Sequence, residues 1–120
     1  MSGFKKHVNK EDNLAIKACL KKKPEPRGPS ETQIQKKIID YLESLGAYVF
    51  KTIKVNRAGV ADVICCLNGT FIAFEVKAAK GRPSPLQVKH VEYVRGAGGL
   101  SEIVYSLEEV KECLRVWNLI

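Results

Sequence analysis

The chain has 120 residues, of which 45% are hydrophobic, which is enough for one domain with a substantial core. It has no run of about 18 apolar residues and no apolar signal-like segment near Met1, so we expect a cytosolic protein, in the host-cell cytoplasm if the chain is viral, without a membrane span. The net charge of +7 and pI near 9.3 favour a polyanionic partner such as nucleic acid, although a basic protein without one has the same composition.

Residues 1–29 differ from the rest of the chain and carry most of its excess positive charge. A short helix is predicted over 9–23, because Asp12 lies early and lysines lie late, as the helix dipole prefers. The segment KKKPEPRGPS that follows contains three prolines and a glycine, which interrupt regular structure. We interpret residues 1–29 as a basic arm or short helix plus linker, and residues 30–120 as the folded domain.

A helix is predicted to begin after Ser30, which forms an S-x-x-Q capping box with Gln33. Gly46 ends it, and the apolar residues between them recur at helical spacing: Ile34, Ile38, Leu42 and Leu45. Residues 47–55, AYVFKTIKV, are rich in β-branched and aromatic residues and predict a strand.

Two strands are predicted next, over 61–66 and 70–78, followed by a loop, AKGRPSP. A second helix begins at Ser84, with Pro85 at its first position, and ends at GAGG. SEIVYS predicts a short strand. A last helix opens with a capping box formed by Ser106 and Glu109, and its inward residues are Leu107, Val110, Leu114 and Trp117. The predicted order is therefore helix, three strands, helix, strand, helix.

The dipeptide Asn68-Gly69 predicts a two-residue hairpin between the second and third strands. In that register Asp62 lies directly opposite Glu75, and opposed residues have Cβ atoms about 4.5–5.5 Å apart. Lys77 lies on the same face, because side chains alternate along a strand. The three charged residues therefore form one cluster at the end of an otherwise apolar hairpin.

Two opposed carboxylates repel each other, and a neighbouring lysine relieves only part of that repulsion. A divalent cation relieves it better, and carboxylate oxygens suit Mg²⁺ or Mn²⁺. Two alternatives remain open from these residues alone. In the first, the cluster is a salt-bridged triad. In the second, its inward charges protect an edge strand from aggregation.

The four cysteines are Cys19, Cys65, Cys66 and Cys113. They form no C-x-x-C pair and the chain has two histidines, so a zinc site is poorly supported. We expect buried free thiols.

The motifs RAGVAD, FEVKAAKGRPSPLQ and RGAGG resemble the VRR-NUC domain, the virus-type replication-repair nuclease of the PD-(D/E)XK superfamily. The similarity extends from about residue 30 to about residue 110. It implies an α/β fold, the restriction-endonuclease-like αβββαβ core, with a mixed central sheet flanked by helices. The chain departs from the family pattern at Ala61, where proline is frequent.

The resemblance also implies roles for single residues. Asp62 and Glu75 match the metal-binding acids, together with the main-chain carbonyl of Val76, and Lys77 matches the catalytic lysine. Gln87 matches a glutamine near the active site, and Glu31 an acid that reaches the metal, often through water.

Other interpretations remain open for the residues outside the charged cluster. Gln87 also completes a capping box with Ser84, and Glu31 lies in a first helical turn, where any acid is favoured. Arg57, Lys80 and Arg82 flank the site in loops and are expected to contact DNA phosphates, unless they are merely solvated.

The sequence therefore predicts a Mg²⁺- or Mn²⁺-dependent endonuclease that hydrolyses DNA, with no membrane partner and no small-molecule cofactor. The resemblance further implies activity like that of Holliday-junction resolvases, on branched DNA and as a homodimer, since a C₂ dimer presents two equivalent sites to a junction. The alternatives are a monomeric nuclease without structure preference and a basic DNA-binding module that does no chemistry.

Overall fold

The computed structural model describes residues 28–120; the helix predicted over 9–23 and Cys19 lie outside these residues. The described elements follow the predicted order. They are α2 (Glu31–Ser44), β1 (Tyr48–Lys51), β2 (Val63–Leu67), β3 (Thr70–Val76), α3 (Pro85–Gly96), β4 (Leu100–Val104) and α4 (Leu107–Val116). No helix within this part of the chain has the length and apolar character needed to cross a membrane.

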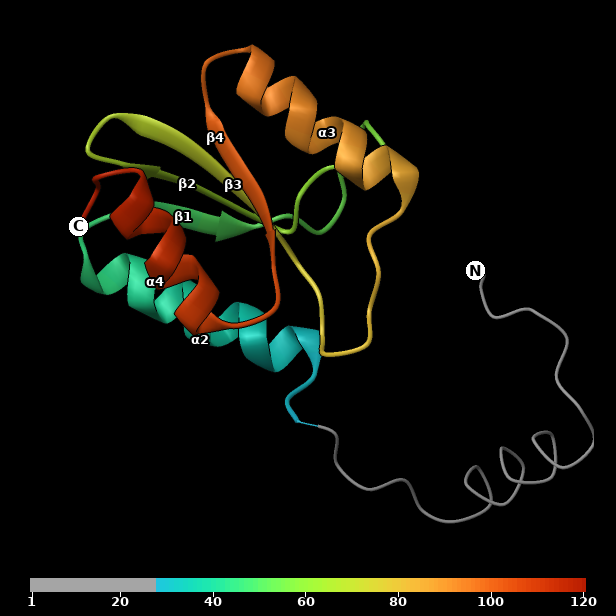
Figure 1. The fold of residues 1–120 in the computed structure, drawn as a ribbon, viewed down its shortest axis with the longest axis horizontal. Helices are drawn as coiled ribbons and strands as arrows, with labels where there is room; N and C mark the ends of the chain where they lie inside the picture. The colour runs from blue at the N-terminus through green and yellow to red at the C-terminus, as the bar shows by residue number, and fades with distance from the viewer. Residues whose placement is uncertain (1–27) are drawn as a thin grey trace, which may run out of the picture.

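The strands form one mixed sheet in the order β1-β2-β3-β4 (Figure 1). β1 to β3 are antiparallel neighbours, whereas β3 and β4 are parallel and need the crossover that α3 provides. The predicted hairpin register is confirmed, because Leu67 pairs with Thr70. Asn68 and Gly69 have φ angles of 53° and 80°, the left-handed values that a two-residue I′ turn requires.

The helices divide between the two faces of the sheet (Figure 1). α2 and α4 cover one face, where they bury alternate strand residues in a single core: Val63, Cys65, Leu67, Ile72, Phe74, Val76 and Val104. α3 packs on the other face, mainly against β4 and less against β3. That face is covered only in part, so Tyr48, Phe50 and Phe71 remain exposed.

Serine side chains start all three described helices. The reciprocal boxes predicted at Ser30 and Ser84 are both present. The box predicted at Ser106 is correct in one bond and wrong in the other. Ser106 Oγ accepts from the Glu109 N–H, as predicted. Glu109 Oε1, however, accepts from the Tyr105 N–H instead of the Ser106 N–H. Ser106 is more extended than the other caps, with φ −161°, which turns its own N–H away from the first turn.

Four predicted strand ends are wrong by two residues or more, all at the same end of the sheet. β1 stops at Lys51 instead of residue 55, and β2 begins at residue 63 instead of 61. β3 stops at residue 76 instead of 78, and β4 stops at residue 104 instead of 106. Beyond the Lys51–Val63 pair the chain bends away into a loop, so the apolar Ile53 is 90% exposed. β-Branched residues favour a strand, but no partner strand reaches them here.

The described cysteines are free thiols in different environments. Cys65 is buried in the core, and burial raises its pKa to about 11, so it is an unreactive packing residue. Cys66 is exposed, contrary to the expectation of buried thiols, because adjacent strand residues point to opposite faces and Cys66 lies on the partly covered one. Cys113 is half-buried.

Candidate active site

Asp62 lies one residue before β2, just beyond the last pair of the hairpin ladder. It therefore does not form the in-strand pair with Glu75 that the register predicted. The Asp62 carboxylate instead reaches across to β3, where its Oδ2 accepts a hydrogen bond from the Val76 N–H at 2.9 Å. This bond fixes Asp62 at the end of β3.

Glu75 is a charged residue inside the central strand β3, and only 2% of it is exposed. Its Oε2 accepts from Gln87 Nε2 at 2.8 Å and lies 3.3 Å from Lys77 Nζ. Its Oε1 is buried and has no hydrogen-bond partner among the described residues. A buried oxygen of an ionised carboxylate without a partner is costly, so the ionised form of Glu75 needs a cation or a hydrogen-bond donor at this oxygen, whereas the neutral form can share its proton with Asp62.

The surroundings of Glu75 favour its neutral form in the free protein. Burial, followed by the nearby negative charge of Asp62, raises the Glu75 pKa from 4.5 to about 7, although the Lys77 ammonium opposes the shift. A carboxyl group whose pKa is raised by burial and by a neighbouring carboxylate is typical of functional sites.

Lys77 directly follows β3, and both its backbone and its side chain are held in place. Its N–H donates to the Val104 carbonyl, which continues the β3–β4 pairing by one residue. Its side chain is 13% exposed and packs against Gly81, where an added Cβ would lie 3.4 Å from the Lys77 Cβ and Cδ. The Tyr105 hydroxyl donates to the Gly81 carbonyl and holds this loop in place. Lys77 therefore has little freedom to leave Glu75.

Gln87 performs two roles that the sequence presented as alternatives. Its Oε1 accepts from the Ser84 N–H and completes the cap of α3, while its Nε2 donates to Glu75. The start of α3 is thereby tied directly to the central carboxylate. Because the two bonds use different atoms, helix capping does not compete with a role in the site.

Glu31 does not join these residues. Among residues 28–120, no group of three or more histidine, cysteine, aspartate or glutamate side chains is close enough to hold a metal ion together. Glu31 is partly buried in the first turn of α2. The metal role that the resemblance implies for it stays a prediction.

The loop before Asp62 packs closely on α3, which explains why the GVAD motif begins with a glycine. Gly59 has a φ of 82°, and an added Cβ would lie 2.6 Å from Leu86 Cγ and 3.1 Å from His90 Cδ2 on α3. A side chain at this position would therefore push the loop away from α3. Arg57 in the same loop lies over the Tyr93 ring, 6.0 Å from its centroid.

Lys80 and Arg82 line a separate open cavity of about 510 Å³, together with Gly81 and Tyr105. This cavity lies in the loop that directly follows Lys77. Contact with DNA phosphates stays a prediction.

Sequence reasoning missed residues that support the site without being charged. The Thr52 N–H and hydroxyl donate to the carbonyls of Asp62 and Ala61, respectively, at 2.8 Å each, and so position the Asp62 segment. Ser101 is buried beside Glu75 in a small cavity, and its hydroxyl donates to the Ala73 carbonyl. Thr52 gave no signal because it lay inside an apparently continuous strand.

Gln35 is buried one helical turn after Glu31, and its Oε1 has no partner among the described residues. The sequence signal that could have identified Gln35 was its place as a polar residue within an apolar helical repeat.

The donor set fits a hard divalent cation. Mg²⁺ is usually held by one or two carboxylates with several waters and substrate phosphates, not by a cage of protein ligands. Asp62 and Glu75 supply two carboxylates, and the partnerless Glu75 Oε1 supplies a ready ligand atom. The absence of a third acid in the described residues is compatible with that mode of binding.

Comparison with known proteins shows similarity at the level of structure. No protein-family model matches the chain, and no curated protein does. A solved structure described as a VRR_NUC domain has 28% sequence identity and a TM-score of 0.63, over 73% of this chain and 97% of that one. A second, a VRR_NUC domain protein, has 15% identity and a TM-score of 0.61, over 74% and 88%.

The Holliday junction resolvase Hjc from Archaeoglobus fulgidus has 18% identity and a TM-score of 0.50, over 62% of this chain and 67% of that one. At this identity the likeness concerns the fold. The mixed sheet flanked by helices is the restriction-endonuclease-like fold, as predicted. The resemblance of this chain to the VRR-NUC domain of the PD-(D/E)XK superfamily, inferred from its motifs, is thus confirmed by its structure.

Proposed function

We propose that this chain is a divalent-metal-dependent endonuclease that hydrolyses DNA phosphodiester bonds. The observation that carries the proposal is the meeting of Asp62, Glu75 and Lys77 at one end of the hairpin, with Glu75 buried and one of its oxygens without a partner. The similarity to VRR_NUC domain structures and to a resolvase supports a nuclease of the PD-(D/E)XK type.

The ion would be Mg²⁺ or Mn²⁺, and the carboxylates of Asp62 and Glu75 and the carbonyl of Val76 would hold it. When bound, the ion supplies positive charge at the phosphate and increases the acidity of a water molecule. Burial raises the Glu75 pKa most and repulsion from Asp62 adds to it, and the positive charge of the ion would offset that repulsion and favour the ionised form of Glu75.

The residues of the chain act around that centre. The Val76 N–H and the Gln87 amide each donate to one oxygen of a carboxylate, which orients Asp62 and Glu75. The Lys77 ammonium, beside Glu75, polarises the attacking water or offsets negative charge that grows on the phosphate. Partial burial of the cluster strengthens these interactions.

The test is cleavage of labelled DNA by the full chain with Mg²⁺, Mn²⁺ or EDTA. Asp62→Asn should abolish cleavage in either metal. Asp40→Asn is the matched control, because Asp40 lies exposed on α2 in a pair with Lys36 and should tolerate the change. Cleavage that persists in EDTA, or normal turnover by the Asp62 variant, contradicts the metal mechanism. DNA binding without cleavage in any divalent metal would instead favour a basic binding module.

For the substrate we propose branched DNA, and for the assembly a homodimer. A four-way junction has approximate two-fold symmetry and needs paired cuts, which two equivalent sites of a C₂ dimer supply. Light scattering should give twice the chain mass, and a junction should be cut symmetrically on opposing strands. A monomer at micromolar concentration, or single unpaired nicks, contradicts this part while leaving the nuclease proposal intact.

A further inference from the structure

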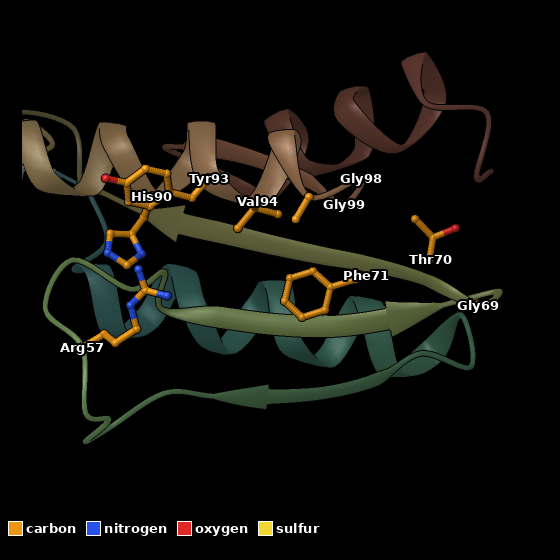
Figure 2. Close-up of a pocket in the computed structure, with 10 residues that line it drawn as sticks. Arg57, Gly69, Thr70, Phe71, His90, Tyr93, Val94, Gly98 and Gly99 are labelled. Carbon is orange, nitrogen blue, oxygen red and sulfur yellow. The ribbon is translucent and has the colours of Figure 1, made fainter.

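An open groove of about 570 Å³ lies between α3 and the exposed side of the hairpin (Figure 2). Its volume is in the range of about 300–1,000 Å³ that is typical of ligand pockets. Arg57, His90 and Tyr93 gather at one end, and Gly69 and Thr70 of the hairpin turn lie at the other (Figure 2). Phe71 lies between them (Figure 2).

The chemistry of the groove is aromatic and basic. Tyr93 is 50% exposed and Phe71 47%, so both present ring surface to solvent. The His90 ring meets Tyr93 edge-on, at 5.4 Å between centroids, and Arg57 lies over the same Tyr93 ring. Within the described part of the chain, no acidic residue lines the groove. Flat apolar rings beside an arginine suit a planar group attached to an anion.

The shape of the groove depends on close backbone approach. An added Cβ at Gly99 would lie 3.0 Å from Val94 Cγ1 and 3.1 Å from Phe71 Cδ2, closer than ordinary contact. The start of β4 therefore passes tightly against Phe71. Together with Gly59, which packs the Arg57 loop against His90, this fixes the rings relative to the backbone.

The groove continues toward the catalytic carboxylate. A smaller cavity of about 90 Å³ is lined by Glu75 and Gln87, and it shares Phe71, His90 and Val94 with the groove. These shared residues place the groove next to the cavity that Glu75 lines. The position of the groove is thus set by the same helix, α3, that holds Glu75 through Gln87.

We propose that the groove holds an unpaired nucleobase of the DNA strand adjacent to the phosphate that is cut. The base stacks on Tyr93 and Phe71, and Arg57 contacts its phosphate. A paired base inside a duplex already stacks on its neighbours, so its face is not available to a protein ring. The inference rests on the proposed nuclease function and narrows the branched DNA proposed there to DNA with unpaired nucleotides beside the cut, as in a splayed arm, a flap or a junction whose central bases are unpaired.

The experiment measures binding by the full chain in EDTA, where cleavage does not interfere. The probes are a splayed-arm DNA and a blunt duplex of equal length. In the splayed arm, one unpaired base is replaced by a fluorescent adenine analogue whose emission falls when it stacks. Tyr93→Leu should weaken binding of the splayed arm roughly 5- to 150-fold, the range expected for loss of one base–aromatic stack, and should abolish the fall in emission. Tyr93→Phe should restore both, and binding of the duplex should change little.

Tyr48→Leu is the matched control, because Tyr48 is 73% exposed on β1 and does not line the groove. Phe71→Leu provides a second variant inside the groove and should also reduce the fall in emission. Equal losses for duplex and splayed arm, or an equal loss in the Tyr48 variant, would overturn the proposal in favour of general binding by the whole sheet face or a second copy of the chain covering it. Unchanged binding and emission in the Tyr93 variant would also overturn it.

Cleavage is measured separately with Mn²⁺, so the two proposals fail in different ways. Tyr93-dependent binding without cleavage contradicts the nuclease function and retains the stacking site. Cleavage without Tyr93-dependent binding retains the nuclease and refutes the stacking site.

Discussion

The two faces of the sheet differ in what covers them. On the face under α2 and α4, side chains such as Ile72 and Phe74 are fully buried and apolar. On the face under α3, one strand end carries Glu75 with its charged neighbours, and the rest keeps exposed rings beside an open groove. The same strands supply both faces, because alternate residues point in opposite directions.

The comparison suggests a division of roles, in which one face of the sheet stabilises the fold and the other carries the charged residues. Burial of apolar area on the first face provides most of the folding free energy. The second face can then tolerate a buried carboxylate with an unsatisfied oxygen, which opposes folding. Changes on the two faces should therefore have effects of different kinds.

The largest expected effect on stability comes from a substitution on the face that α2 and α4 cover. Phe74→Ala should lower the free energy of unfolding by about 3–5 kcal/mol, because Phe74 is fully buried and stacks on Trp117 at 5.9 Å between centroids. Phe71→Ala, three residues earlier on the open face, should cost only about 1 kcal/mol. Urea unfolding measures both, and equal losses would show that the open face is as well packed as the core.

The second expected effect is on activity. Lys77→Ala should lower the cleavage rate by roughly 100- to 1,000-fold, the usual cost of removing one electrostatic group from an active site. Its fold should survive, because the Lys77 backbone bond to Val104 is kept. Lys36→Ala, on the exposed side of α2, should cleave normally. Single-turnover rates with saturating enzyme distinguish a loss of chemistry from a loss of binding, and an unchanged rate would remove Lys77 from the site.

The third effect is a pH dependence of stability in the absence of metal. The Glu75 pKa is about 7 in the folded chain, above its ordinary value of 4.5. The folded chain therefore binds more protons than the unfolded chain between these values. The free energy of unfolding should fall as pH rises through this window, by at most roughly 3 kcal/mol, and level off above it.

Urea unfolding of wild type and Glu75→Gln at several pH values tests this dependence. The variant should lack the part of the pH slope that Glu75 causes, and a saturating divalent cation should reduce that slope in wild type, because the ion favours the ionised carboxylate. Identical slopes in wild type and variant would show that Glu75 titrates normally.

The smallest expected effect comes from two glutamines in equivalent positions of their helices. Gln33→Ala and Gln87→Ala each remove the second bond of a capping box and should each cost about 1 kcal/mol of stability. Only Gln87 also donates to Glu75, so only its variant should cleave DNA more slowly. Equal cleavage by both variants would reduce Gln87 to a helix cap.

The sequence by itself determined the elements and the charged cluster. Capping serines, helical periodicity and the Asn68-Gly69 turn act over a few residues, and so they specify the helices and the hairpin register without knowledge of the rest. Because Asp62, Glu75 and Lys77 lie on one hairpin, their proximity followed from that local register. The departure of Asp62 from the ladder did not follow, since it depends on Thr52 and the bend after β1.

The contacts of α3 with the rest of the domain followed only from the tertiary structure. The bond from Gln87 to Glu75, the close packing of Gly59 on α3 and the groove beside Tyr93 join segments that are far apart in the chain. Local propensity carries no information about which part of a sheet a helix will cover, and α3 leaves the β1 side open. The exposure of Cys66 and Phe71 was therefore set by packing between distant elements.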